Sequence, residues 1–191
     1  MEIIMLFEKK LYGTHDERIV QMLEMAGWHK GRYVDVSLVE KYYKEQRVAV
    51  VHPAKDFFHE YYGIADAWYI TRSPKLTSIG RVAPDFQFDL YPSKRLDEVS
   101  EFVFDVYGNG YPNPHKEQIA INDAAREETT LVGEIGYYYP ARVWIGASGA
   151  FYTLHEYDHG EVHFYRTLID FLMWETKQLS LDSAVILQLN K

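Results

Sequence analysis

Hydrophobic positions in the first third of the chain recur at helical spacing. The predicted inward face of the first helix consists of Ile19, Val20, Leu23 and Ala26, with Met22 beside it. Thr14 and Glu17 have the spacing of a capping box at its start. Gly27 follows at the position where a left-handed residue commonly ends a helix. The pattern therefore predicts a helix over residues 15–26.

Two further short helices are predicted before residue 64. Ser37 and Glu40 have the spacing of a second capping box, which predicts a helix to about Gln46. His52 and Pro53 predict the start of a third, because proline suits the first helical position, and Gly63 predicts its end. The inward face of this third helix reads Ala54, Phe57, Phe58 and Tyr61.

Strand patterns dominate the rest of the chain. Residues 86–90 alternate with a period of two, and residues 68–71 have strand composition. From Thr130 onward, short apolar runs between turns predict a meander with strands near 131–134, 142–145, 151–154 and 162–164. Further helices are predicted at 96–107, 116–128 and 165–174, and the apolar tail 179–189 predicts a strand or a helix.

These elements predict one α+β domain over residues 1–191, with N-terminal helices followed by a mostly antiparallel central sheet flanked by helices. In the last helix, the residues expected to face inward are Leu168, Ile169, Leu172 and Met173. The adjacent carboxylates Glu127 and Glu128 are expected on a solvated helix face.

Composition narrows the classes of partner. The 191 residues carry 20 Lys and Arg against 28 Asp and Glu, a net charge of −8. This charge argues against binding to nucleic acid or to an anionic membrane surface, and it favours a basic protein partner. The chain has no cysteine, which excludes disulfides and thiolate metal sites. No apolar run reaches 18 residues and no signal-peptide pattern is present, so the expected location is the cytoplasm.

The segment from His155 to His159 matches H-E-x-x-H, the pattern of zinc metalloproteases. That chemistry requires a helix, where His155 and His159 share a face and Glu156 activates a zinc-bound water. Here the motif follows a predicted strand and ends in Asp158-His159-Gly160, which is typical of a turn. A strand end is the preferred interpretation, and a small zinc hydrolase remains the alternative.

Other catalytic patterns are missing from the sequence. It contains no G-x-S-x-G, P-loop or G-x-G-x-x-G, so no catalytic residue, cofactor or metal is predicted. Instead the chain is rich in tyrosine, with 16 residues. Two sets of residues at predicted strand ends combine tyrosine with acidic groups and are candidates for a partner-binding surface. They are Tyr137, Tyr138 and Tyr139, and Glu156, Tyr157 and Asp158. The alternative is that the tyrosines pack the rim of the sheet.

The stretch from Ala26 to Asp35, AGWHKGRYVD, resembles the N-terminal signature of the SUKH-3 immunity proteins, a branch of the SMI1/KNR4 superfamily. Five later segments resemble further elements of the family in the same order: residues 56–64, 88–89, 131–134, 149–152 and 168–174. Three of them depart from the family pattern. Residues 61–62 differ from the first two positions of the family tetrad, Leu131 replaces a proline, and the segment 149–152 lacks an arginine. The resemblance covers residues 15–175.

The resemblance implies an α+β fold and a cytoplasmic immunity protein that binds and neutralises a bacterial toxin domain, such as a nuclease or a nucleic-acid deaminase, without catalysis of its own. A regulatory scaffold without a toxin, as some superfamily members resemble, is a further alternative. No catalytic residue transfers, and the oligomeric state stays open. Within the signature, Trp28 is expected to wedge between the first two helices, and Arg32 to hold a nearby carboxylate.

Overall fold

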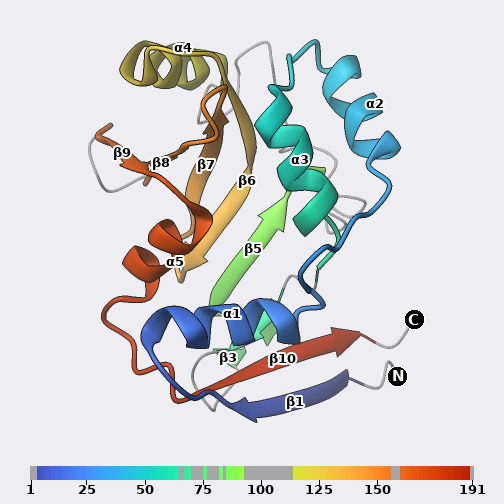
Figure 1. The fold of residues 1–191 in the computed structure, drawn as a ribbon, viewed down its shortest axis with the longest axis vertical. Helices are drawn as coiled ribbons and strands as arrows, with labels where there is room; N and C mark the ends of the chain where they lie inside the picture. The colour runs from blue at the N-terminus through green and yellow to red at the C-terminus, as the bar shows by residue number, and fades with distance from the viewer. Residues whose placement is uncertain are drawn as a thin grey trace.

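An eight-stranded antiparallel sheet forms the centre of the protein (Figure 1). This computed structural model describes residues 4–64, 67–69, 75–76, 82–83, 85–92, 114–155 and 160–189. The strand order is β1-β10-β2-β5-β6-β7-β8-β9. The bounds of these strands are β1 Ile4–Lys10, β2 Ala67–Tyr69, β5 Phe86–Leu90, β6 Thr129–Tyr137, β7 Ala141–Gly146, β8 Phe151–Leu154, β9 Val162–Tyr165 and β10 Ser183–Leu189. A separate two-stranded sheet pairs β3 (Lys75–Leu76) with β4 (Val82–Ala83).

Helices cover both faces of the large sheet. Figure 1 shows α1 (His15–Met25), α3 (His52–Tyr61) and α5 (Leu168–Thr176) over one face, with α2 (Ser37–Glu45) beside α3. Their apolar side chains join one core with the facing side chains of the sheet. On the opposite face lies α4 (Pro114–Ala125), whose Ile121 packs against Leu131, Trp144 and Tyr152. Because side chains alternate along a strand, Val143 and Ile145 enter the first core while Trp144 enters the second.

Polar contacts attach α4 to its face of the sheet. The Glu117 carboxylate pairs with the Arg142 guanidinium, and their side chains are only 17% and 12% exposed. Gln118 Oε1 accepts a hydrogen bond of 3.1 Å from Trp144 Nε1, and Gln118 Nε2 donates to Thr129 Oγ1 at 2.7 Å. These contacts place the polar side of α4, as well as its apolar side, against the sheet.

The predicted first and third helices are confirmed. Thr14 and Glu17 form the expected capping box, with Thr14 N–H donating to Glu17 Oε2 at 2.8 Å. Ile19, Leu23 and Ala26 are buried as predicted. In α3, Ala54, Phe57 and Phe58 are buried on the expected face.

Two local predictions about carboxylates and caps are wrong. Ser37 is not the cap of α2: the cap position is Val36, and the Asp35 carboxylate accepts the Ser37 N–H at 3.0 Å. Glu127 does not lie on a solvated helix face, because α4 ends at Ala125. The Glu127 carboxylate instead accepts hydrogen bonds from Ser148 N–H and from Tyr152 OH, both at 2.7 Å. In each case a carboxylate accepts hydrogen bonds from groups close to it in sequence or in space, and the local pattern does not predict these pairings.

The predicted strands at 86–90 and through the meander are confirmed, and the tail is a strand rather than a helix. The prediction missed β1, which precedes α1 and pairs with β10 over its whole length, Ile4 opposite Leu189 and Lys10 opposite Ser183. The helix predicted at residues 96–107 lies outside the described residues.

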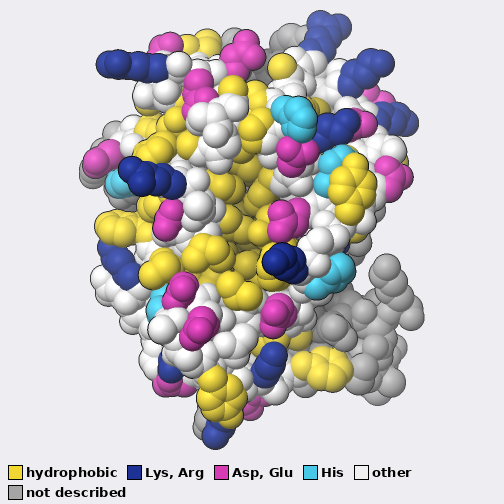
Figure 2. All heavy atoms as spheres, viewed as in Figure 1, with side chains coloured by type: hydrophobic (Ala, Val, Ile, Leu, Met, Phe, Trp, Pro, Cys, Tyr) yellow, Lys and Arg dark blue, Asp and Glu magenta, His cyan; other side chains and the backbone are white. Residues whose placement is uncertain are grey.

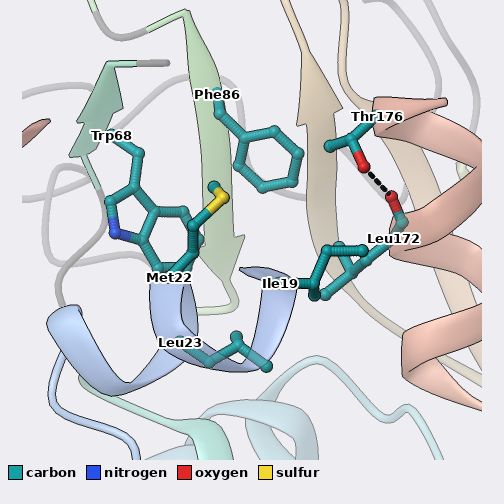
Figure 3. Close-up of a pocket in the computed structure, with 7 residues that line it drawn as sticks. All are labelled: Ile19, Met22, Leu23, Trp68, Phe86, Leu172 and Thr176. Atoms are coloured by element: carbon teal, nitrogen blue, oxygen red, sulfur yellow. Dashed lines mark hydrogen bonds between the residues drawn. The ribbon is translucent and has the colours of Figure 1, made fainter. Parts of the chain in front are cut away.

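A small apolar pocket lies where α1 and α5 meet the sheet (Figure 3). It is lined by Ile19, Met22, Leu23, Trp68, Phe86, Leu172 and Thr176. The hydroxyl of Thr176 donates to Leu172 O at 2.7 Å and lies 2.8 Å from His15 Nε2. Because this hydroxyl is already bonded and the surface of the pocket is otherwise apolar, the pocket is a feature of core packing.

Candidate partner-binding surface

The three consecutive tyrosines lie at the end of β6 and in the turn before β7, where the backbone has a defined conformation. Tyr138 has φ of 59°, a left-handed conformation that is uncommon for a bulky side chain. Its N–H donates to Asp85 O at 2.7 Å, and Tyr139 N–H donates to Tyr137 O at the same distance. These bonds tie the turn to the residue that precedes β5, so the tyrosine backbone is ordered before any partner arrives.

The three tyrosines differ in exposure. Tyr139 is 64% exposed and Tyr138 39% exposed, whereas Tyr137 is half-buried against the main core. The Tyr137 and Tyr138 rings meet edge to face, with centroids 4.4 Å apart. Burial, with the contact to Tyr138, raises the pKa of Tyr137 to about 12, so its hydroxyl is neutral at physiological pH. Tyr137 therefore packs the sheet rim, while Tyr138 and Tyr139 lie at the surface.

Helix α5 is joined to this turn through Glu175. Its Oε1 lies 2.9 Å from His155 Nε2, and the two side chains are only 6% and 16% exposed. Its other oxygen lies against Gly136, where an added Cβ would come within 2.6 Å of Glu175 Oε2. The end of α5 and the tyrosine turn thus share one packed junction.

The H-E-x-x-H segment begins at a strand end, as the preferred interpretation predicted. His155 directly follows Leu154, the last residue of β8, and its ring contacts Glu175. Glu156, Tyr157, Asp158 and His159 lie outside the described residues. Within the described part of the chain, no group of three or more His, Cys, Asp or Glu side chains is placed to hold a metal ion.

Two exposed apolar residues of α5 lie beside this junction, and sequence reasoning did not select them. Met173, which was predicted to face inward, is 38% exposed, and Trp174 is 46% exposed. The Trp174 ring lies 6.4 Å from that of His163, and Lys177 Nζ lies over its face. We call Tyr138, Tyr139, Met173 and Trp174 the tyrosine–α5 surface.

The inward positions of α5 explain why Met173 was misplaced. Leu168, Phe171, Leu172 and Thr176 are buried, and the Glu175 side chain is nearly so. Their spacing is that of one helical face, but two of its members are polar. A search for apolar residues alone therefore rotates the predicted face toward Met173. The helix also begins at Leu168, three residues after the predicted start at Tyr165.

The same face of the molecule carries a band of aromatic side chains. Figure 2 shows hydrophobic side chains gathered between α3 and α5, with acidic, basic and histidine side chains around them. Phe57 of α3 stacks on Tyr61 at 4.8 Å and meets Phe151 of β8 at 5.6 Å. Phe57 and Phe151 are only 6% and 7% exposed, so the band is a closely packed floor rather than an open cavity.

The corner that follows α1 extends this band, and two expectations about it are wrong. Trp28 does not wedge between the first two helices: its ring stacks on Tyr61 of α3, with centroids 6.2 Å apart. Among the described residues Arg32 forms no ion pair with a carboxylate: it donates to the backbone oxygens of Glu60 and Tyr62 at 2.6 and 2.7 Å, and the Glu60 charge acts on it at longer range. Gly27 has the predicted left-handed conformation, with φ of 102°.

No helix within the described residues is long and apolar enough to cross a membrane.

Comparison with known proteins identifies the family of this fold. A family model described as SUKH-3 immunity protein matches residues 15–171. The match begins at the first residue of α1 and ends within α5, so β1 and β10 lie outside it. Comparisons with curated proteins and with solved structures found no match. The matched segment spans most of the chain and contains the helix corner, the sheet from β2 to β9 and the tyrosine turn, and the chain belongs to the SUKH-3 immunity protein family.

Proposed function

We propose that this protein is a stoichiometric immunity protein that binds a cognate toxin domain in the cytoplasm and blocks it without catalysis of its own. The family match supports an immunity role and a toxin partner in general. We infer further that the toxin is a basic domain, such as a nuclease or a nucleic-acid deaminase. Nucleic acids and membranes are not partners in this proposal.

The observation that carries the choice of surface is the fixed conformation of the tyrosine turn. Tyr139 is 64% exposed, and the backbone N–H groups of Tyr138 and Tyr139 are both hydrogen-bonded. Ordering an interface costs conformational free energy when a partner binds, and a pre-ordered turn avoids most of that cost. Tyrosine and tryptophan also dominate the energetic centres of protein interfaces. The tyrosine–α5 surface has both properties.

Charge supplies the second argument. The chain has a net charge of −8, and the charged side chains around the apolar band on the face that carries α5 include acidic groups as well as basic ones (Figure 2). Enzymes that act on nucleic acids present basic surfaces to the phosphate backbone. An acidic inhibitor is attracted to such a surface over long range, which raises the rate of association at low ionic strength. We place Glu156, Tyr157 and Asp158, between β8 and β9, in the same interface.

The test is calorimetric titration of the purified protein with the toxin domain encoded beside its gene, at low salt. We expect a one-to-one complex whose formation inhibits the toxin and whose affinity falls as salt is raised. Absence of a complex at low salt would contradict the proposed function.

A pair of matched variants tests the surface separately from the function. Tyr139→Ala removes an exposed ring of the turn and is expected to weaken binding by at least about tenfold, or about 1.4 kcal/mol. Tyr33→Ala removes a ring that is 75% exposed in the loop between α1 and α2, and it is expected to leave binding unchanged. If the wild type binds and Tyr139→Ala binds equally well, the toxin uses another surface.

A further inference from the structure

Strand β9 is one end of the large sheet. It pairs with β8 alone, and the strand order of the described residues ends with it. None of its four side chains is buried, whereas three of the four in β8 are. Phe164 is 56% exposed although it lies in the middle of the strand. Exposed edge strands are natural templates for pairing with another chain.

The register shows which backbone groups face outward. Gly146 N–H donates to Ala150 O at 2.9 Å in the turn between β7 and β8, and hydrogen-bonded pairs alternate from there in an antiparallel ladder. Residues 151 and 153 of β8 therefore bond toward β9, where their partners are Tyr165 and His163. The N–H and C=O groups of Val162 and Phe164 consequently point away from β8. Within the described part of the chain, no strand covers the edge that these two residues form.

Opposite charges stand at the two ends of this edge. Glu161 precedes the strand and Arg166 follows it, and both are exposed. Neither forms an ion pair with another described residue. A strand with an acid at one end and a base at the other is complementary to an antiparallel copy of itself, because reversal sets the acidic end of each strand beside the basic end of the other.

We propose that β9 pairs with β9 of a second copy of this chain across a two-fold axis, which joins two eight-stranded sheets into one of sixteen. Antiparallel pairing that keeps the two faces aligned places one residue opposite its own copy, either His163 or Phe164. In the first register Phe164 lies opposite Val162 of the partner subunit, and in the second opposite Phe164 of the partner subunit. Both registers cover the exposed Phe164 ring with an apolar side chain.

Both registers place Glu161 diagonally across the strand pair from Arg166 of the partner subunit, so the two charges attract one another across the joined edge without standing directly opposite. Pairing through β9 stops at a dimer, because each chain has one β9 edge and the partner subunit covers it. This inference does not depend on the proposed toxin binding, since it needs only the protein itself.

Analytical ultracentrifugation over a dilution series tests the proposal. We expect a reversible equilibrium between the 22.4 kDa chain and its dimer, with dimer dominant at about 100 µM and weakened by high salt. A wild-type protein that is monomeric at every concentration to about 100 µM in low salt would overturn the proposal. A monomeric protein would overturn the proposal even if Phe164 substitutions weakened toxin binding, because that result would assign the β9 edge to the toxin and not to a second copy.

Two sets of variants identify the interface. Phe164→Pro removes an outward N–H without removing a bond to β8, and edge strands tolerate such prolines. It is expected to weaken dimerisation at least about tenfold, while Phe164→Thr, which keeps the N–H, weakens it less.

Charge reversal covers the case in which Phe164→Pro does not fold. Glu161→Arg and Arg166→Glu are each expected to weaken the dimer, and the two together in one chain to restore it. A dimer that is indifferent to both single reversals, or a double variant no stronger than the single ones, would assign dimerisation to another surface.

Discussion

The indole Nε1 of Trp28 donates a hydrogen bond of 2.9 Å to Glu60 Oε1, which joins the corner after α1 to the last turn of α3. The same ring stacks on Tyr61 with an angle of 7° between the planes. Arg32, four residues after Trp28, donates to the two backbone oxygens that flank Tyr61. The family signature is therefore a clamp on the C-terminal end of α3, which in turn carries Phe57 and Phe58 into the core.

Removal of the Trp28 ring should loosen this clamp. Trp28→Ala is expected to lower the free energy of unfolding by about 2 to 3 kcal/mol, less than a fully buried tryptophan because the ring is half-buried. Trp28→Phe keeps the stack on Tyr61 and loses the bond to Glu60, for a loss of about 1 kcal/mol. Urea unfolding measures both. Equal losses in the two variants would show that the hydrogen bond, and not the stack, dominates.

Arg32 tests the backbone contacts of the clamp. Its guanidinium reaches two carbonyl oxygens at once, at the negative end of a helix dipole. Arg32→Ala should cost about 2 kcal/mol, and Arg32→Lys should recover less than half of it, because an ammonium cannot match the planar fork. Thermal unfolding at neutral pH provides the comparison. Full recovery by lysine would mean that charge alone is required.

The ion pair under α4 should respond differently to loss of each partner. Arg142 pairs with Glu117 of α4 and also lies opposite Glu134 in the register of β6 and β7. Arg142→Met removes the positive charge beside two carboxylates and should lower the free energy of unfolding by about 3 kcal/mol. Glu117→Gln leaves Arg142 beside Glu134 and should lower it by less. A double-mutant cycle by urea unfolding measures the coupling. A larger loss for Glu117→Gln would contradict this account.

Glu127 should make stability depend on pH in the acid range. Burial by itself raises the pKa of this carboxyl, but hydrogen bonds from Ser148 and Tyr152 outweigh it and hold the pKa below its ordinary value. A lowered folded-state pKa contributes stability above the unfolded value, near 4.5, and that contribution is lost as the pH falls through the folded value. The difference in unfolding free energy between wild type and Glu127→Gln should therefore shrink from pH 6 toward pH 3.5. A constant difference would show that the bonds do not depend on ionisation.

Much of the fold could be predicted from local pattern. The capping box before α1, the proline at the start of α3 and the alternation in β5 each act through neighbouring residues, and each predicted its element. Strand β1 was missed because its pairing partner, β10, lies at the other end of the chain. Met173 was misplaced because the inward face of α5 includes Glu175, whose neighbours His155 and Gly136 lie after β8 and in β6.

The candidate surface also combines features that the sequence predicted with features that only the tertiary structure shows. The run of tyrosines marked a surface loop, but only the bond from Tyr138 N–H to Asp85 O and the burial of Tyr137 decided which rings face solvent. Trp174 belongs to the candidate surface because of its exposed position on α5, and no sequence motif predicted it.

The sequence by itself determined the α+β class, most elements and the resemblance to the SUKH-3 family, because periodicity, caps and motif order are local. Tertiary structure alone decided the role of Trp28 and Arg32, the position of Glu127 and the exposure of β9. Those depend on which distant groups satisfy a buried donor, fill a helix face or leave a strand edge unpaired.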